Sequence, residues 1–445
     1  MSRLILPLLA LAAPLSAATP PQPGERIALV GNGLGERLLD HPWFETELQL
    51  RHPDKKLLVR NFCRPGNTAG FRPHPSRNSQ WAFPGADKFH PQHKTHAGRG
   101  HHPTPDEWLT TFGADTILGF FGYNESFDGE AGLDHFRGEI DAFIPHTQAQ
   151  QYNGKSAPRP ILVSPTAYED LSDKRDLPDG SAENERLAAY TTAMKEVAAA
   201  RGIEFIDLFS ETVRLYPTFD GDFTRNGFLP TDAGYRLLGP ALANLAFGES
   251  KRVSKADPDK LADAIRDKNW FWFQDYRMFN GVHVDGRRYK PFGPANYPAE
   301  TEKVRAMTEA RDEYIHAAIN GRRFDLRAAD AKTPELPEIQ TNYRPSNKNG
   351  TAEYVEPSQA VDALAVPEGY KIELFASEFD FPNLANPVQL SFDDKGRLWV
   401  ATMPSYPHYR PGDERPDDKI LIYEDTNGDG RADKEIIFAD GLHVP

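Results

Sequence analysis

Residues 26–31 read RIALVG, an apolar run that ends in glycine. Four further runs share its lack of polar alternation: KLLVRN (56–61), DTILGFFG (115–122), PILVSP (160–165) and IEFIDLF (203–209). Runs of this kind are typical of strands that are buried on both faces, as in a parallel sheet. The five runs therefore predict a five-stranded parallel sheet.

Helical patterns fill the intervals between these strands. The predicted helices span residues 36–50, 133–148, 184–200 and 232–247. In the third, apolar residues recur at spacings of three and four and make one stripe: Leu187, Tyr190, Met194 and Val197. The alternation predicts a flavodoxin-like α/β/α sandwich over residues 25–248, and folds of this kind bind ligands at the carboxyl ends of their strands.

The first 18 residues have the pattern of a signal peptide. Arg3 supplies a positive start, residues 4–15 are mostly apolar, and residues 16–18 are small, as at a cleavage site. The apolar run is shorter than the roughly 20 residues that a membrane-spanning helix needs, and no other stretch approaches that length. We therefore expect a secreted or periplasmic protein without a transmembrane segment.

Charge and cysteine content exclude several classes of function. The chain of 445 residues carries a formal net charge of -14, which argues against a nucleic-acid partner. Cys63 is the only cysteine, so neither an internal disulfide nor a Cys-x-x-Cys-His haem motif can form. Because it follows an apolar strand, we expect Cys63 to be a small buried hydrophobic residue rather than a catalytic thiol.

The pattern changes beyond residue 250. Residues 251–325 predict a helical appendage, and residues 326–358 read as a linker. Residues 366–445 contain short strands separated by the turn signals DDKG (393–396) and TNGDG (426–430). This spacing predicts the start of an all-β propeller. A propeller needs several blades of about 40–50 residues, so we expect the gene product to continue past residue 445.

Short motifs stand at the predicted strand ends. Gly31-Asn32-Gly33-Leu34 follows the first strand, Gly66 lies after the second, and Gly122-Tyr123-Asn124-Glu125 follows the third. The motif NGFLPTDAGY (226–235) precedes the last helix. In order and placement these motifs resemble those of the SGNH (GDSL-type) hydrolases, over residues 25–248.

The resemblance implies acyl transfer by a serine, a histidine and an aspartate, with the oxyanion held by amide donors. In this chain the serine position is occupied by Gly33, the histidine position by Leu229 and the aspartate position by Asn226. Only the oxyanion-type residues Gly66 and Asn124 are retained. We therefore expect a degenerate hydrolase domain without esterase activity.

A binding role is the expectation that remains for the strand ends. The residues predicted to hold a small molecule, such as a carbohydrate or polyol, are Asn32, Gly33, Gly66, Asn124 and Glu125. The alternative interpretation of residues 122–132 is a turn followed by the acidic first turn of a helix.

An active ester hydrolase, such as a carbohydrate esterase or deacetylase, is a second hypothesis. It requires a relocated nucleophile, for which Ser126 is the candidate. The interpretation that the pattern favours for this residue is a turn or helix-cap serine. The motif Asn280-Gly281-Val282-His283 resembles the family's histidine motif, but it lies in the helical appendage.

The C-terminal part carries a second resemblance. VPEGY (366–370), NPV (386–388) and GRLWV (396–400) are similar to the opening of a bacterial propeller family called membrane-bound dehydrogenases, which is related to the quinoprotein sugar dehydrogenases. SGNH-like domains are sometimes fused ahead of it. The resemblance implies a third hypothesis, a sugar oxidoreductase whose function lies in the propeller.

Two segments could attract metal ions. Residues 425–433 match the first nine positions of a calcium loop, with Ile436 at the twelfth position in place of glutamate; the candidate ligands are Asp425, Asn427, Asp429 and Asp433. The alternative is a tight hairpin turn. Loop 71–106 contains six histidines without a recognisable ligand spacing, so we expect them to be structural: His74, His90, His93, His96, His101 and His102.

Overall fold

Five parallel strands form the central sheet of the N-terminal part, in the order β2-β1-β3-β4-β5. This is the flavodoxin-like order, which confirms the predicted parallel sheet. The strands are β1 (Arg26–Gly31), β2 (Leu58–Asn61), β3 (Thr116–Phe120), β4 (Arg159–Val163) and β5 (Glu204–Ile206). β5 is shorter than predicted because Asp207 caps helix α6 (Leu208–Leu215).

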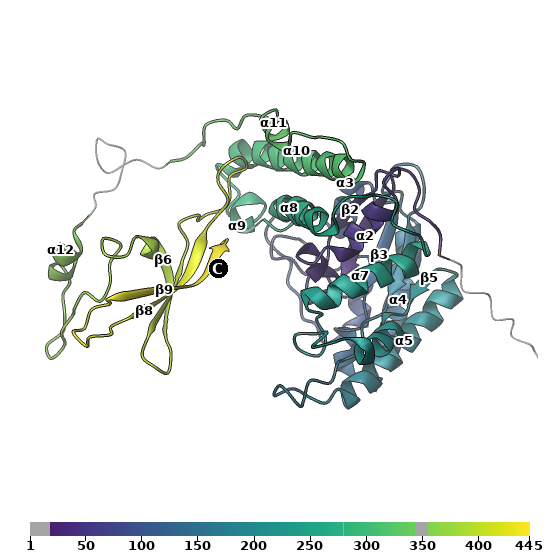
Figure 1. Ribbon diagram of the computed structural model, residues 1–445, viewed down its shortest axis with the longest axis horizontal. Coiled ribbons are helices and arrows are strands. Elements are labelled where there is room, and N and C mark those ends of the chain that lie inside the picture. The colour runs from purple at the N-terminus through teal and green to yellow at the C-terminus, as the bar shows by residue number, and fades with distance from the viewer. Residues whose placement is uncertain (1–17, 279, 343–354) are drawn as a thin grey trace, which may run out of the picture. The chain divides into compact units, whose positions relative to one another are not determined.

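Helices cover both faces of this sheet (Figure 1). In β1, Ile27 and Leu29 enter one core while Ala28 and Val30 enter the other. Helices α2 (Trp43–Arg51) and α7 (Asp232–Phe247) close the first core, and α3 (Pro105–Phe112), α4 (Leu133–Gln148) and α5 (Ser181–Arg201) close the second. Burial on both faces explains why the strand sequences show no polar alternation.

The computed structural model describes residues 18–278, 280–342 and 355–445, so the predicted signal peptide lies outside the described residues except for Ala18. The chain divides into two units. The first runs to Tyr276 and includes residues 285–287 and 305–333, and the second contains residues 277–284, 288–304 and 334–445. None of the described helices is both long enough and apolar enough to span a bilayer.

Helix α8 (Pro258–Tyr276) packs on the α/β sandwich of the first unit. Its Trp272 and Tyr276 join the second core, and their ring N–H and hydroxyl groups donate to the carbonyls of Asn61 (2.8 Å) and Phe62 (2.9 Å). Residues 258–276, predicted as part of a separate helical appendage, therefore share a core with the sheet.

Four buried charges also join α8 and helix α10 (Gly293–Ile319) to the sandwich. Lys268 on α8, which is 0% exposed, donates to both carboxylate oxygens of Glu45 on α2, at 2.7 and 2.6 Å. Arg60 on β2 makes a bidentate pair with Asp312 on α10. Each cation therefore has its own carboxylate in the interior.

The second unit contains a four-stranded antiparallel sheet in the order β6-β7-β8-β9. Its strands are β6 (Pro387–Phe392), β7 (Leu398–Thr402), β8 (Asp418–Glu424) and β9 (Lys434–Leu442). The strand pairs predicted on either side of the turns at 393–396 and 426–430 are confirmed, and a complete propeller is not shown. The sequence YKIELFA (370–376) also predicts a strand, but these residues form none. Every residue of β6 is exposed, including Leu390 and Phe392.

The remaining helices are short. They are α1 (Gly33–Glu36), α9 (Gly281–Val284), α11 (Leu326–Asp330) and α12 (Pro357–Asp362). The predicted helix 36–50 is interrupted between α1 and α2, where Pro42 lacks the backbone N–H that a helix interior requires. Part of the predicted linker, residues 343–354, lies outside the described residues.

Candidate functional site

The turn after β1 holds position 33 at the carboxyl end of the sheet. Gly31 has a φ of 125°, and a Cβ built there would lie 2.1 Å from the carbonyl oxygen of Phe120. Glycine is therefore required at Gly31. Asn32 caps the following helix, because its Oδ1 accepts the Leu34 N–H at 3.1 Å. Gly33 is the first residue of α1.

Gly33 faces Leu229. A Cβ built on Gly33 would lie 3.9 Å from Leu229 Cδ2 and 3.7 Å from Pro65 Cα, which is ordinary van der Waals contact. The residues at the positions of the nucleophile and the base are therefore neighbours in space. Neither has a side chain that can attack a carbonyl carbon or accept a proton.

Asn226 has a local structural role. Its Oδ1 accepts the backbone N–H of Leu229 at 2.9 Å and that of Phe228 at 3.3 Å. Side-chain carbonyls of asparagine commonly close turns in this way. At the position where the family's aspartate orients a histidine, Asn226 thus shapes the turn that presents Leu229.

The loops after β2 and β3 complete this edge of the sheet. Asn124 Nδ2 donates to the carbonyl of Asn67 at 2.8 Å and so ties the two loops together. Gly66 is exposed, and a Cβ built there would meet no atom within 4 Å. The second N–H of the Asn124 side chain has no hydrogen-bond acceptor among the described residues.

The predicted ligand-binding residues divide into two groups. Asn32 and Glu125 are only 1% and 6% exposed, and both side chains accept backbone N–H groups. They therefore support the turns from inside. The groups that remain for a ligand are Gly33, Gly66 and Asn124.

An aromatic surface lies beside Asn124. The ring of Tyr123 stacks on Phe228 with centroids 3.3 Å apart, and Phe127 meets Tyr123 edge-on at 5.4 Å. Phe127 is 67% exposed, although a large apolar side chain gains free energy from burial. An exposed aromatic ring next to amide donors is typical of ligand sites.

A known family model matches one segment of the chain. Residues 356–445 match a domain of unknown function, DUF7133. No curated protein matches the chain.

Solved structures overlap about half of the chain. BT4096, a gut microbial diltiazem-metabolizing enzyme, is 15% identical over 52% of this chain, with a TM-score of 0.35, and the overlap covers only 48% of that enzyme. A lipase/acylhydrolase from Enterococcus faecalis is 18% identical over 51% of this chain and 98% of its own, with a TM-score of 0.34. A catalytic mutant of Axe2, an acetylxylan esterase from Geobacillus stearothermophilus, is 13% identical over 51% of this chain and 96% of its own, with a TM-score of 0.36. At these identities and TM-scores, the overlaps assign no reaction to this chain.

Ser126, the candidate relocated nucleophile, is buried. The residue is 3% exposed, and its Oγ donates a hydrogen bond to the carbonyl of Tyr123 at 2.7 Å. No imidazole among the described residues bonds to this hydroxyl. The geometry is that of a turn serine, so the structure provides no base that could activate it.

Glu125 and Glu139 form a buried carboxyl pair below the loops. Glu125 Oε2 accepts the Gly122 N–H at 2.8 Å, while its Oε1 has no hydrogen-bond partner among the described residues. Glu139 Oε1 accepts hydrogen bonds from Thr68 and Gly70 and contacts His90 Nε2 at 2.7 Å. Burial, and then the charge of Glu139, raise the pKa of Glu125 to about 8.

The free energy of unfolding is expected to fall as the pH rises from about 4.5 to about 8. The lower value is the pKa of Glu125 in the unfolded chain, and the higher value is its pKa in the folded protein. In this interval the folded state keeps a proton that the unfolded state releases, so higher pH favours unfolding. Glu125→Gln removes this titration and should flatten the pH dependence relative to the parent. Urea denaturation at a series of pH values measures it, with Glu130→Gln, an exposed acid in the same segment, as the control. An unchanged slope in Glu125→Gln would contradict the assignment.

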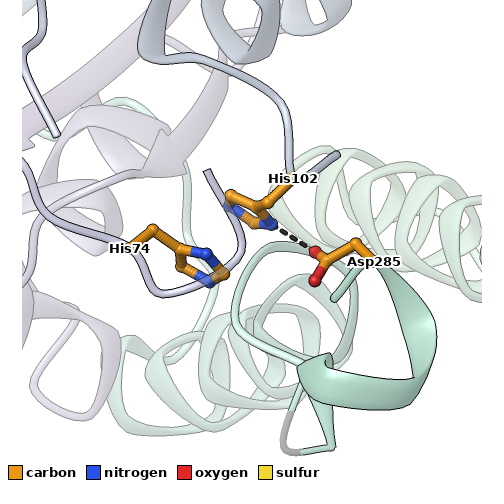
Figure 2. A group of neighbouring side chains, drawn as sticks. All are labelled: His74, His102 and Asp285. Atoms are coloured by element: carbon orange, nitrogen blue, oxygen red, sulfur yellow. Dashed lines mark hydrogen bonds and ion pairs between the residues drawn. The ribbon is translucent and has the colours of Figure 1, made fainter. Parts of the chain in front are cut away.

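Figure 2 shows a cluster that sequence reasoning did not assemble: His74 and His102 from loop 71–106, with Asp285. Their ligand atoms all lie within 4.8 Å of one another, and this is the one such group of three or more among the described residues. The imidazole rings stack with centroids 3.6 Å apart and an 11° angle between planes. Burial, and then the charges of His102, Arg64 and Arg77, lower the pKa of His74 to about 2.

The cluster does not fit a metal ion in this arrangement. The indole of Trp108 can only donate, so its bond to His102 Nε2 at 3.2 Å places the ring proton on Nδ1, which faces Asp285 Oδ2 at 2.5 Å. Neither nitrogen of His102 keeps a free lone pair. Nearly parallel rings also cannot both direct in-plane lone pairs at one ion about 2.1 Å away. The cluster therefore anchors loop 71–106.

In the candidate calcium loop, side-chain oxygens accept backbone N–H groups. Asp425 accepts the N–H groups of Gly428 at 2.7 Å and Gly430 at 2.8 Å, and Asn427 Oδ1 accepts that of Asp429 at 2.9 Å. Asp433 bonds to Thr426. The three carboxylates of this loop do not gather within 4.8 Å. This geometry is that of the hairpin-turn alternative, and calcium binding by the loop stays a prediction.

The histidine of the second motif, His283, lies in α9 of the second unit. Its Nδ1 bonds to Asn280 Oδ1 at 2.8 Å, within the same turn. Cys63 is fully buried, and burial raises the pKa of its thiol well above the usual value, as expected for a small hydrophobic residue.

Proposed function

We propose that the α/β unit is a non-hydrolytic ligand-binding domain built on a hydrolase-type architecture. The contact between Gly33 and Leu229 carries this proposal, because it puts hydrogen and hydrocarbon where a nucleophile and a base would have to meet. With neither group present, the retained oxyanion donors supply at most a residual rate enhancement.

The ligand that the exposed groups fit best is a carbohydrate or polyol. The apolar face of a sugar ring can stack on the exposed ring of Phe127, and its hydroxyl groups can accept from Asn124 Nδ2. Buried Asn32 and Glu125 would hold the turns rather than touch the ligand.

Esterase assays on the full chain test the first part of the proposal. p-Nitrophenyl acetate and acetylated xylan should be hydrolysed no faster by the parent than by Asn124→Ala. The triple variant Gly33→Ser, Asn226→Asp, Leu229→His should gain turnover of roughly tenfold or more over the parent, since the oxyanion positions persist. Parental turnover that Asn124→Ala abolishes, or labelling of the parent by a serine-reactive phosphonate, would refute the proposal.

Affinity electrophoresis in gels containing soluble xylan tests the binding surface. The parent should be retarded, and Phe127→Ala should lose most of that retardation because it removes the exposed ring. Tyr370→Ala is the matched control, since Tyr370 is 77% exposed and lies in the second unit. Equal retardation of the parent and Phe127→Ala would exclude this surface.

We also propose that residues 366–445 form one blade of a dehydrogenase-type propeller, which would give the whole protein a sugar-oxidising partner domain. The support is a four-stranded antiparallel sheet, the form of a propeller blade, with exposed apolar residues on its strands such as Leu390, Phe392 and Phe438. An experimental structure of the protein tests this. Similar sheets around a central axis are expected, and a closed two-sheet sandwich would refute it.

A further inference from the structure

A cavity with three arginines in its wall lies beside the loop that follows β2. Its enclosed volume is only about 10 Å³, room for roughly one water molecule, and the figure rises to about 350 Å³ when the open solvent at its mouth is included. All of its lining residues belong to the first unit. The residues that the argument uses are Arg64, Asn67, Arg72, Arg77, Trp108 and Tyr276.

Arg72 is buried, and no carboxylate among the described residues forms an ion pair with it. The residue is 7% exposed, its Nε donates to the Thr68 carbonyl at 3.3 Å, and its Nη2 has no hydrogen-bond partner among the described residues. Its guanidinium lies 5.7 and 5.5 Å from the ring centroids of Phe121 and Phe143. Burial lowers the pKa of Arg72.

Arg77 is also a buried arginine whose hydrogen bonds go to backbone carbonyls. It is 4% exposed, and its Nε and Nη1 donate to the carbonyls of Pro103 and Arg72, both at 2.8 Å. Burial lowers its pKa to about 10. Among the described residues, neither Arg72 nor Arg77 forms an ion pair with a carboxylate.

The acidic groups near these arginines are already engaged. Asp106 bonds to His146 at 3.0 Å and to Tyr152 at 2.6 Å, and Asp285 bonds to His102. Elsewhere in the same unit, buried cations have their own carboxylates, as Arg60 has Asp312. The cavity therefore concentrates positive charge in a low-dielectric wall, which is costly unless an anion enters.

We propose that this cavity binds an oxyanion, the carboxylate, sulfate or phosphate group of a ligand. Guanidinium groups present forked donors that match the oxygens of such groups, often two at a time. Trp108 and Tyr276 form the apolar part of the wall, and the rest of a ligand would lie outside the enclosed space, at the open mouth. The cavity adjoins the strand-end site, because Asn67 lines it and accepts the hydrogen bond from Asn124.

This proposal does not depend on the proposed function, because anion binding and the absence of ester hydrolysis are measured separately. If the cavity holds the acidic group of a sugar, the two sites belong to one ligand. If it holds a free inorganic anion, the anion stabilises loop 71–106.

Calorimetric titration and thermal unfolding of the full chain test the site. Sulfate, phosphate and acetate should raise the Tm above that in chloride at equal ionic strength. D-glucuronate compared with D-glucose distinguishes an acidic sugar from a free anion. Arg72→Gln and Arg77→Gln should each weaken sulfate binding by at least about tenfold, since each removes a charge-assisted hydrogen bond. Arg99→Gln, an exposed arginine of the same loop, should bind as the parent does.

An equal Tm in sulfate and chloride would overturn the proposal, and so would a sulfate effect that survives both substitutions. If Arg72→Gln does not fold, Arg77→Gln and Arg64→Gln give the same readout, because Arg64 is only half-buried. Arg77→Lys keeps the charge and loses the fork, so partial retention of sulfate affinity is expected.

Discussion

Gly31→Ala is expected to lower the free energy of unfolding of the α/β unit by more than about 4 kcal/mol, which lies in the extreme tail for single substitutions. The new Cβ would lie 2.1 Å from the Phe120 carbonyl oxygen, and the φ of 125° is one that alanine rarely adopts. Gly31 and Phe120 are register partners on adjacent strands, so neither can withdraw without breaking the pairing of β1 with β3.

The control for this substitution lies two residues away. A Cβ on Gly33 meets nothing closer than 3.7 Å, so Gly33→Ala should change stability by less than about 0.5 kcal/mol. Urea denaturation followed by circular dichroism compares the two variants. Similar losses in both would show that the backbone requires glycine at both positions. The expected contrast would show that the backbone leaves room for a serine at Gly33.

Lys268→Met is expected to destabilise the first unit by about 3–5 kcal/mol, the usual consequence of leaving one partner of a buried ion pair without the other. Glu45 is 4% exposed, and both of its oxygens accept from Lys268. Without the ammonium group, the carboxylate at Glu45 would face the interior uncompensated.

The double variant Glu45→Leu, Lys268→Met should recover most of this loss, because it removes both charges and keeps a similar volume. Burial raises the pKa of Glu45, so the single variant should also regain stability as the pH falls and this carboxyl takes up a proton. Lys260→Met, an exposed change on the same helix, should be neutral. A single variant as stable as the double variant at neutral pH would contradict the burial argument.

The amino-acid sequence predicted the central sheet well. Strands that are buried on both faces must be apolar throughout, so their signal survives in the order of residues alone, as RIALVG at β1 shows. Helices α4 and α7 begin and end where their periodicity placed them. The sequence also sufficed to place Gly33 and Leu229 at the serine and histidine positions. Each lies in a short motif, and the motifs follow the predicted strands in a fixed order along the chain.

The contacts between distant segments needed the tertiary structure. His102 and Asp285 are 183 residues apart in the sequence, and no local pattern in either segment predicts that they form a hydrogen bond. The burial of Asn32, Ser126 and Glu125 is likewise invisible in a turn-rich sequence, where polar residues read as exposed.

The arginine cavity shows the same division most clearly. The sequence shows that Arg72 and Arg77 are charged, but only the folded structure shows whether a carboxylate lies close enough to form an ion pair with them. Periodicity is a property of neighbours in sequence, whereas electrostatic compensation depends on which segments meet in space. Local order therefore determined the architecture, and packing alone determined which charges were left unpaired.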